Sequence, residues 1–300
     1  MNNCRICNSK TIFLMNKDGY DINKCYNCGL VFVNEKFNQK DIVDNFYSDK
    51  NNYQRHRVKL SLDKIKINKK YNFIFNFLNE NKIKGKLLDV GCSNGEFLYF
   101  AQKRGIDSFG VEVNKITADF AIKNGLKVKN GFLEEQHYQD NYFSVIRLGD
   151  LIEHLVEPEK ILIECKRILK NNSYLIISTP NLNCFWSKIT FLLYKIFKIP
   201  WSSLTPPLHL YYFSNNNLDM LLKKYNFNPV LKKYYNPSKL KHELGRTHLL
   251  RRYKNNKSFV NFIYMLFAYS FYSIFYFINL LYSSIINKNF FMLAIYKLEK

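Results

Sequence analysis

A glycine-bracketed turn constrains the fold of this chain more than any other feature. Gly91-Cys-Ser-Asn-Gly95 joins a short apolar strand, residues 87–90, to a predicted helix, residues 94–104. Glycines let a turn approach a ligand closely and direct its N–H groups at it. A second strand, residues 108–111, ends at Glu112. In dinucleotide-binding folds a carboxylate at this place accepts both hydroxyls of a ribose.

Strands and helices alternate along the rest of the middle region. Helices are predicted at residues 114–124 and 158–169, and strands at residues 126–129, 143–148 and 174–178. A basic helix, residues 57–83, precedes them. The alternation predicts an α/β fold class with a parallel sheet and helices on both faces. A nucleotide-like ligand is then expected over the carboxyl ends of the strands.

Several segments resemble ordered motifs of the class I S-adenosylmethionine-dependent methyltransferases. Residues 87–95 (LLDVGCSNG) are similar to the first motif, and residues 142–158 (YFSVIRLGDLIEHLVEP) to the fourth-strand segment. Residues 168–181 (ILKNNSYLIISTPN) resemble the fifth strand and its exit, with Asn171-Asn172 where the family usually has a glycine pair. Residues 207–214 (PLHLYYFS) resemble a signature of the small-molecule branch. The resemblance implies a Rossmann-like, seven-stranded methyltransferase sheet.

The same resemblance assigns S-adenosylmethionine to particular residues. Its cofactor-binding residues are Asp89, Gly91, Cys92, Gly95, Glu112, Phe132, Leu133, Leu148 and Gly149. The glycine turn is expected around the methionine part, Glu112 at the ribose, and Phe132 at the adenine. Family members often carry an acidic residue near position 132, and its absence here leaves the adenine contacts open. Phe132 is equally consistent with core packing.

Methyl transfer to a hydroxyl depends on alignment of the acceptor and benefits from a base. His154, with Glu153 beside it, and His209 are the candidate catalytic residues. Asp150, Glu153 and His154, predicted on one helix face, resemble the acidic-histidine cluster with which some quinone-pathway O-methyltransferases bind a divalent metal such as Mg²⁺. His154 is therefore read as a base, as part of a metal site, or as a structural residue at a helix start. The candidate substrate contacts are Asp150, Tyr211 and Tyr212.

Two CxxC pairs lie near the N-terminus. Cys4 and Cys7 are separated from Cys25 and Cys28 by a stretch with short predicted strands at residues 11–15 and 20–24, and a third strand follows at residues 30–33. Each CxxC presents two thiolates from one turn, and two turns complete a tetrahedron around Zn²⁺. The spacing predicts a zinc ribbon with a closed, structural site, and the alternative is two unrelated redox or structural pairs. No signal peptide is apparent, so we expect a cytoplasmic chain with reduced cysteines.

The charge of the chain is concentrated in its flanks. The formal net charge is +21, from 45 Lys+Arg and 24 Asp+Glu. Residues 86–180 contain 12 basic and 13 acidic residues, residues 1–85 contain 16 and 8, and residues 181–300 contain 17 and 3. A genomic composition bias alone does not produce a neutral middle between basic ends. The excess indicates an anionic partner, either nucleic acid or an anionic membrane surface.

Residues 184–201 are largely apolar. Lys188, Lys195 and Lys198 fall on one side of a helix, and the two tryptophans, Trp186 and Trp201, lie near its ends. This pattern is typical of a helix in a membrane interface, and a lid helix over the substrate pocket is the alternative.

Residues 258–286 carry no charge and follow a basic run, residues 221–257. They lie between segments that resemble the sixth strand, residues 226–235, and the seventh, residues 289–298. Both ends must then meet one sheet, so a shallow helical hairpin is predicted rather than a membrane crossing. A protein–protein surface is the alternative.

The expected domains are a zinc ribbon (1–36), a helical linker and cap (37–85), a methyltransferase domain (86–235 and 288–300) and a basic then apolar insertion (236–287). We expect methylation of a sugar or lipid-linked glycan hydroxyl in polysaccharide biosynthesis, by a cytoplasmic protein peripheral to the inner face of the membrane. Similar zinc-ribbon methyltransferases act on sugars. The alternatives are an rRNA or tRNA methyltransferase, and a non-catalytic scaffold that binds the cofactor.

Overall fold

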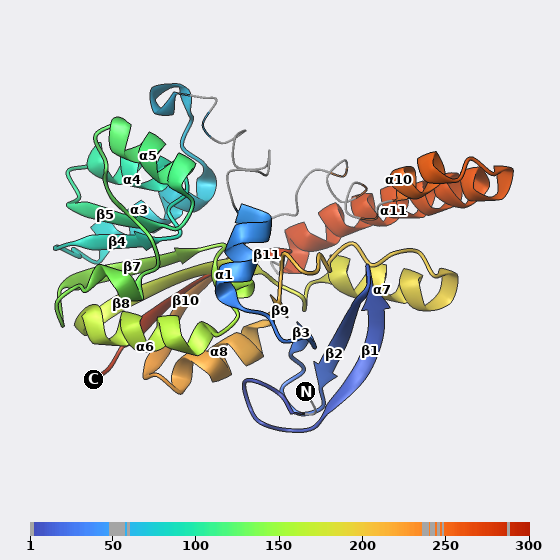
Figure 1. Cartoon of the computed structure of the whole chain (residues 1–300), viewed down its shortest axis with the longest axis horizontal. Coiled ribbons are helices and arrows are strands. Elements are labelled where there is room, and N and C mark those ends of the chain that lie inside the picture. The colour runs from blue at the N-terminus through green and yellow to red at the C-terminus, as the bar shows by residue number, and fades with distance from the viewer. Residues whose placement is uncertain are drawn as a thin grey trace. The chain divides into compact units, whose positions relative to one another are not determined.

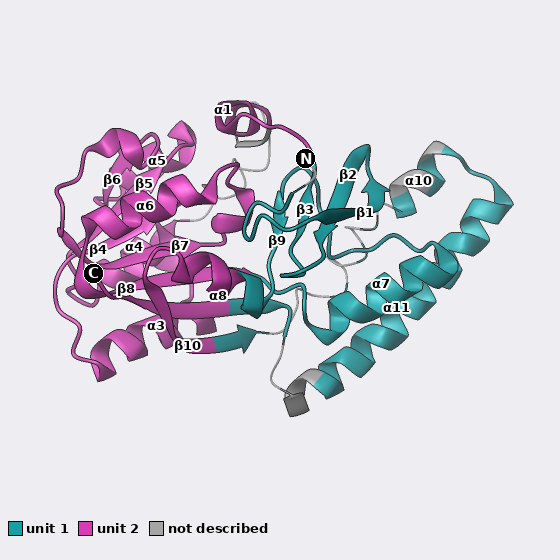
Figure 2. Ribbon diagram, turned by 90° about the horizontal axis from the view of Figure 1, so that it is seen from below, with its two compact units in different colours: residues 1–34, 180–217, 233–292 teal, residues 35–179, 218–232, 293–300 magenta. Residues whose placement is uncertain are grey.

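The computed structural model describes residues 3–47, 61–235, 249–286 and 289–300, together with Val58, Leu240, Leu244 and Thr247. Its contacts divide the chain into two compact units. Unit 1 comprises Met1–Asn34, Pro180–Asn217 and Lys233–Met292, and unit 2 comprises Glu35–Thr179, Leu218–Lys232 and Leu293–Lys300 (Figure 2). Much of the basic run predicted between residues 221 and 257 lies outside the described residues.

Unit 1 contains a four-stranded sheet. Its strands, in spatial order, are β1 (Thr11–Lys17), β2 (Tyr20–Cys25), β3 (Val31–Val33) and β9 (Tyr211–Tyr212), all antiparallel to their neighbours. The first three strands confirm the strands predicted around the cysteines. The contribution of β9 was not expected, because a two-residue strand from a distant segment has no periodic signal.

Unit 2 is built on a seven-stranded sheet with the order β10-β11-β8-β7-β4-β5-β6. The bounds are β4 Leu87–Val90, β5 Ser108–Glu112, β6 Lys127–Asn130, β7 Phe143–Gly149, β8 Leu169–Pro180, β10 Phe227–Tyr235 and β11 Phe291–Leu298. The pairs β4·β5, β4·β7, β5·β6 and β7·β8 are parallel. The predicted α/β, Rossmann-like fold class is confirmed.

Helices cover both faces of this sheet (Figure 1). One face carries α3 (Lys69–Glu80), α4 (Glu96–Gln102) and α5 (Lys115–Lys123), and the other carries α6 (Pro158–Ile168) and α8 (Asn215–Lys223). The side chains of Asn68 and Asn114 cap α3 and α5 by accepting hydrogen bonds from first-turn amides. Of the helix predicted over residues 57–83, the structure shows α3 from its cap at Asn68 onward, and residues 57, 59 and 60 lie outside the described residues.

Short helical segments connect these elements. They are α1 (Gln39–Ile42), a π-helical turn (Val43–Tyr47), and three 3₁₀ turns, η2 (Leu62–Lys64), η3 (Glu134–Gln136) and η4 (Ile152–His154). The last of these holds two of the predicted catalytic residues.

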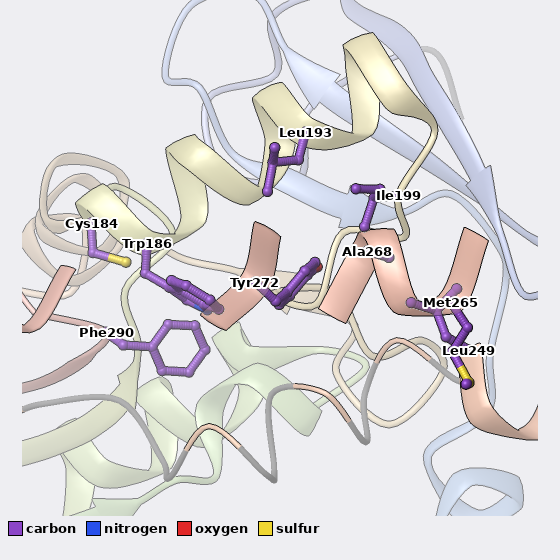
Figure 3. Close-up of a cluster of buried hydrophobic side chains, with 9 residues drawn as sticks. All are labelled: Cys184, Trp186, Leu193, Ile199, Leu249, Met265, Ala268, Tyr272 and Phe290. Carbon is purple, nitrogen blue, oxygen red and sulfur yellow. The ribbon is translucent and has the colours of Figure 1, made fainter. Parts of the chain in front are cut away.

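Unit 1 also contains α7 (Phe185–Phe197), α10 (Leu249–Asn255) and α11 (Phe259–Ile286). The shallow hairpin predicted over residues 258–286 is wrong, because α11 is one continuous helix of 28 residues without a breaking residue. It packs on α7 through a buried cluster that includes Trp186, Tyr272 and Leu193 (Figure 3). By length and composition alone, α11 is also able to span a membrane.

The two tryptophans do not mark the surface of α7, contrary to the sequence expectation. Trp186 is fully buried against the rings of Tyr272 and Tyr276, and Trp201, which is 4% exposed, lies against Phe191. Trp186 is thus part of the interior of the α7–α11 pair, and Trp201 packs on α7. The three lysines of α7 and its end are exposed, as predicted.

Candidate functional site

The glycine turn follows β4 at the carboxyl edge of the parallel sheet. Gly91, Ser93 and Gly95 all have positive φ, at 70°, 52° and 78°. A Cβ on Gly95 would lie 2.4 Å from Leu126 Cδ1 and 3.0 Å from Ala121 Cβ. Glycine is therefore needed at position 95 both for its backbone conformation and for the close approach of α4 to its neighbours.

The amides of this turn are largely used inside the protein. The N–H groups of Gly91 and Cys92 both donate to the carbonyl of Val111, and that of Gly95 donates to the carbonyl of Cys92. The sequence expectation that these N–H groups point at a ligand is therefore wrong for these three. The turn instead has a fixed shape, set by bonds to β5.

Glu112, the last residue of β5, clamps the turn. Its Oε2 accepts a hydrogen bond of 2.7 Å from the amide of Ser93, and its Oε1 accepts one of 2.8 Å from the amide of Asn114. The residue is 6% exposed. Glu112 is thus a fixed carboxylate at the carboxyl edge of the sheet.

A buried ion pair lies directly beside the turn. Asp89 of β4 and Arg147 of β7 are register partners in adjacent parallel strands, and Nη1 of Arg147 lies 2.6 Å from Oδ1 of Asp89. Asp89 is fully buried and Arg147 is 6% exposed. Burial raises the pKa of Asp89, and the guanidinium opposes that shift. The pair is consequently held as an ion pair in the interior.

The guanidinium of Arg147 is enclosed but incompletely paired. It lies over the rings of Phe97 and Tyr71, 4.6 and 5.4 Å from their centroids. Its Nε and the Oδ2 of Asp89 have no hydrogen-bond partner among the described residues. A Cβ on Gly149 would come within 2.1 Å of Nη2, so the guanidinium occupies the space that this glycine leaves. The site therefore holds a buried cation with spare donors at the end of β7.

The other predicted cofactor residues differ in exposure. Cys92 is 5% exposed, and burial raises the pKa of its thiol well above the ordinary value, which makes it unreactive. Leu133 and Leu148 are buried, whereas Phe132, after β6, is half-buried. Phe132 is therefore better placed than Leu133 to contact a ligand with its side chain.

Asp150 does not share a helix with Glu153 and His154. Asp150 has φ of 53°, and only three residues, Ile152–His154, form a 3₁₀ turn. The prediction of a shared helix face is wrong, because a left-handed residue precedes the turn. The carboxylate of Asp150 is engaged by Lys70 Nζ at 3.0 Å and Ser178 Oγ at 2.9 Å. These contacts give no support to Asp150 as a magnesium ligand.

The charge of Asp150 is fixed by its neighbours. Partial desolvation by the surrounding protein opposes ionisation of Asp150, but the ammonium of Lys70 and the guanidinium of Arg147 outweigh it and lower its pKa. Asp150 is therefore an ionised group paired within unit 2, and its predicted contact with substrate stays a prediction.

Glu153 and His154 lie beside each other in the 3₁₀ turn η4. Glu153 is 1% exposed, its Oε2 lacks a hydrogen-bond partner among the described residues, and burial together with the charge of Asp150 raises its pKa to about 8. His154 Nε2 lies 3.9 Å from Glu153 Oε1, beyond hydrogen-bond distance. The pair offers a carboxyl that titrates near physiological pH next to a half-buried imidazole.

His209, Tyr211 and Tyr212 belong to unit 1. The hydroxyl of Tyr211 accepts a hydrogen bond of 2.7 Å from Arg5, and that of Tyr212 accepts one of 3.1 Å from the amide of Thr205. Both tyrosines are at most 3% exposed. They join β9 to the N-terminal sheet, and these contacts give no support to their predicted role in substrate binding. His209 is half-buried, with its amide bonded to the carbonyl of Thr205.

The four N-terminal cysteines converge. All four are free thiols, and the Sγ atoms of Cys4, Cys7, Cys25 and Cys28 lie within 4.8 Å of one another. The contacts Cys4–Cys28 and Cys7–Cys25 are 3.6 and 3.4 Å. A tetrahedral site with Zn–S bonds of about 2.3 Å separates its sulfurs by about 3.8 Å. The amides of Ile6 and Cys28 donate to the sulfurs of Cys4 and Cys25, which favours thiolates. The donor set fits Zn²⁺.

Sequence reasoning missed Arg147, Lys70 and Ser93 as parts of the site. A signal for Arg147 was present, because a charged residue interrupts the apolar strand FSVIRL and buried charges are paired or functional. Lys70 and Ser93 had no such signal, since exposed lysines and turn serines are common.

The fold and the site together define a class of protein. It has a seven-stranded, largely parallel sheet, a glycine turn after the first strand of that sheet in the chain, β4, and an acid at the end of the second, β5. A model of a family described as a methyltransferase domain matches residues 53–232. Because this match covers more than half of the chain, the protein belongs to that methyltransferase family.

Curated relatives match over shorter segments. The ubiquinone biosynthesis O-methyltransferase of Aliivibrio fischeri is 28% identical over an alignment of 113 residues that covers 35% of this chain and 48% of the relative. The protein of the same name from Hahella chejuensis is 25% identical over an alignment of 165 residues that covers 50% of this chain and 69% of the relative. The chain thus spans about half the length of the first of these relatives.

Solved structures share the fold at low sequence identity. Phosphoethanolamine N-methyltransferase 2 of Haemonchus contortus, determined with S-adenosylmethionine, is 13% identical, covers 96% of this chain and 71% of its own, and has a TM-score of 0.53. A putative sarcosine dimethylglycine methyltransferase of Galdieria sulphuraria is 18% identical, covers 86% and 98%, and has a TM-score of 0.50.

Proposed function

We propose that the protein transfers the methyl group of S-adenosylmethionine to a hydroxyl group of a small acceptor. The hydrogen bond from the Ser93 amide to the Glu112 carboxylate, at the carboxyl edge of the sheet, carries this proposal. It fixes the glycine turn and, beside it, the carboxylate proposed to bind the ribose hydroxyls. The hydroxyl is favoured because the matched curated relatives are named O-methyltransferases. When bound, the cofactor supplies an electrophilic methyl group.

The residues around the turn are proposed to hold this cofactor. Glu112, fixed at the end of β5, would accept the ribose hydroxyls, and Phe132 would flank the adenine. Leu148 and Gly149 end β7 beside the glycine turn and would form the floor. Gly91 and Gly95 contribute by shape, since a Cβ at Gly91 would press on Leu151 and one at Gly95 would overlap Leu126 and Ala121.

Arg147 is proposed to bind the carboxylate of the methionine part. Its guanidinium is buried, donates a hydrogen bond of 2.6 Å to Asp89, has an Nε without a partner among the described residues, and fills the space over Gly149. A carboxylate is the ligand that such a planar cation binds best. Asp89 then keeps the guanidinium oriented.

The Glu153–His154 pair is proposed to take the proton of the acceptor hydroxyl. The raised pKa of Glu153, about 8, places its loss of a proton near physiological pH, and His154 lies beside it. In the alternative, His154 is a structural residue of the 3₁₀ turn. The pH dependence of kcat distinguishes the two roles of His154, because replacement of a purely structural histidine by glutamine leaves that dependence unchanged.

The acceptor is proposed to be a sugar or a lipid-linked glycan at the inner face of a membrane. A CxxC ribbon joined to this fold resembles sugar methyltransferases, which supports a sugar acceptor. The apolar helix pair, α7 and α11, supports a lipid carrier. The test incubates the protein with methyl-labelled S-adenosylmethionine and, separately, nucleotide sugars, extracted lipid-linked glycans and RNA. Glu112→Ala serves as the cofactor-site control in every arm.

Label recovered in the glycan fraction supports this function. Label in RNA would identify an RNA methyltransferase, for which the net charge of +21 is the favouring observation. Binding of S-adenosylhomocysteine without transfer to any arm would identify a cofactor-binding scaffold. The last two outcomes each overturn the proposal.

We also propose that the four cysteines bind one structural Zn²⁺. With four sulfur ligands the site is closed to substrate, so the ion holds β1, β2 and their turns together and takes no part in methyl transfer.

A further inference from the structure

Helix α11 exposes more apolar surface than helices of water-soluble units normally do. Its 28 residues carry no charge. An 18-residue window within Phe259–Tyr282 has mean hydropathy 1.4, and 22% of that window is buried. Because exposed apolar surface of this extent marks a binding surface, we propose that α7 and α11 bind an anionic membrane surface, with α11 lying in the plane of the interface.

The buried and exposed sides of α11 are both apolar. Met265, Ala268, Tyr272 and Asn279, spaced by three, four and seven, form the buried stripe, and the first three belong to the cluster shared with α7 (Figure 3). An ordinary amphipathic helix is polar on its other side. Here the other side carries Phe259, Val260, Ile263, Leu266, Ile274, Phe277, Ile278 and Leu281, each at least 41% exposed. On α7, Leu192 and Ile196 are 47% and 60% exposed.

Charge selects an anionic surface as the partner. Lys188, Lys195 and Lys198 are exposed on α7 and its end, and Lys254 and Lys257 are exposed before α11. The sequences of α7, α10 and α11 contain no acidic residue. Residues 181–300 contain 17 basic residues against 3 acidic ones. Apolar side chains combined with unopposed lysines match acyl chains beneath anionic headgroups.

Chain connectivity excludes a transmembrane orientation of α11. Strands β10 and β11, which flank the segment, belong to the same sheet, so the chain would have to cross a bilayer twice. The second crossing would fall to residues 236–258, which carry seven basic residues and one acidic residue. Charges at the bilayer centre are strongly disfavoured. The five tyrosines of α11 also favour the interface.

The test is flotation of the full chain with vesicles of phosphatidylcholine alone and of phosphatidylcholine mixed with phosphatidylglycerol. The apolar variant is Phe277→Ser with Leu281→Ser, at positions that are 63% and 70% exposed. Its matched control is Phe13→Ser with Ile163→Ser, which are 62% and 57% exposed on other elements. The charge variant is Lys195→Gln with Lys198→Gln, and its control is Lys10→Gln with Lys123→Gln, also exposed.

We expect the wild type to float with the mixed vesicles and weakly with neutral ones. The apolar variant should lose about tenfold or more in partitioning, and the charge variant should lose several-fold at low salt only. Both controls should behave as the wild type, and all variants should bind S-adenosylhomocysteine equally. Two outcomes would overturn the proposal: no flotation of the wild type, or a dimer in solution that the Phe277→Ser and Leu281→Ser changes dissociate. The second would make the apolar face a contact between copies of the chain.

Discussion

Arg147 and Asp89 face each other across neighbouring parallel strands, with Nη1 of the arginine 2.6 Å from Oδ1 of the aspartate in the interior of the sheet. Phe97 and Tyr71 cover the guanidinium, and Gly149 leaves room for it. A buried ion pair contributes little net stability by itself, but the loss of one partner is costly. The pair therefore holds a cation in place at the cofactor edge rather than simply stabilising the core.

The first prediction concerns Arg147→Met. Because the change leaves Asp89 buried and unpaired, the free energy of unfolding should fall by about 3 kcal/mol or more. Adding Asp89→Asn should recover much of this loss, since no buried charge remains. Thermal or urea unfolding of the single and double variants measures both effects.

The same variants test the proposed carboxylate contact. In the folded double variant, S-adenosylhomocysteine should bind at least about tenfold more weakly, because a charge-assisted hydrogen bond is lost. 5′-Methylthioadenosine, which has the adenosine but no carboxylate, should bind with unchanged affinity. Equal losses for both ligands, measured by calorimetry, would show that Arg147 shapes the pocket without contacting the carboxylate.

The second prediction separates two costs of replacing a glycine, namely the strain of a positive φ and the overlap of the added Cβ with its neighbours. Gly105 has φ of 70° with no atom within 4 Å of a built Cβ, whereas Gly95 has φ of 78° and close contacts to Leu126 and Ala121. Gly105→Ala should cost about 1 kcal/mol of stability, from the backbone alone. Gly95→Ala should cost several kcal/mol more, because the overlap displaces α4. Equal effects on chemical denaturation would contradict the packing role of Gly95.

The third prediction follows from the raised pKa of Glu153. Its pKa of about 8 in the folded chain exceeds the ordinary value of 4.5, so the folded state binds the extra proton between these values. Stability contributed by this group is complete below pH 4.5 and is lost as the pH rises through 8, by up to about 5 kcal/mol. Glu153→Gln, which is neutral throughout, should flatten this part of the stability profile.

Turnover should show the opposite trend if the pair acts as the base. The wild-type kcat should rise as Glu153 loses its proton near pH 8, and Glu153→Gln and His154→Gln should lower kcat without weakening S-adenosylhomocysteine binding. The same measurement on His209→Gln tests the other candidate histidine, which belongs to unit 1. Unchanged kcat and an unchanged pH profile in both unit 2 variants would leave only the structural role of His154.

The sequence predicted the parallel sheet well, because the strand, turn and helix signals around residues 87–112 are local and all point to one fold. It did not predict β9, since the pairing of Tyr211 with Phe32 joins segments far apart in the chain. It also misplaced Asp150, whose φ of 53° interrupts an otherwise helical pattern. The hairpin expected over residues 258–286 failed for a different reason. The flanking strands determine where that segment begins and ends, but not how it folds between those ends.

The fourth prediction concerns the cysteine cluster. Purified protein should contain one zinc ion per chain by elemental analysis, and Cys4→Ser with Cys28→Ser should abolish it, because each CxxC pair then keeps a single thiolate. The control Cys165→Ser removes a buried thiol of α6 and should leave the zinc content unchanged. Chelation should increase hydrogen exchange in β1, β2 and β3, since these strands are short and depend on the ion. Protein that is metal-free yet keeps these amides protected would contradict the structural zinc site.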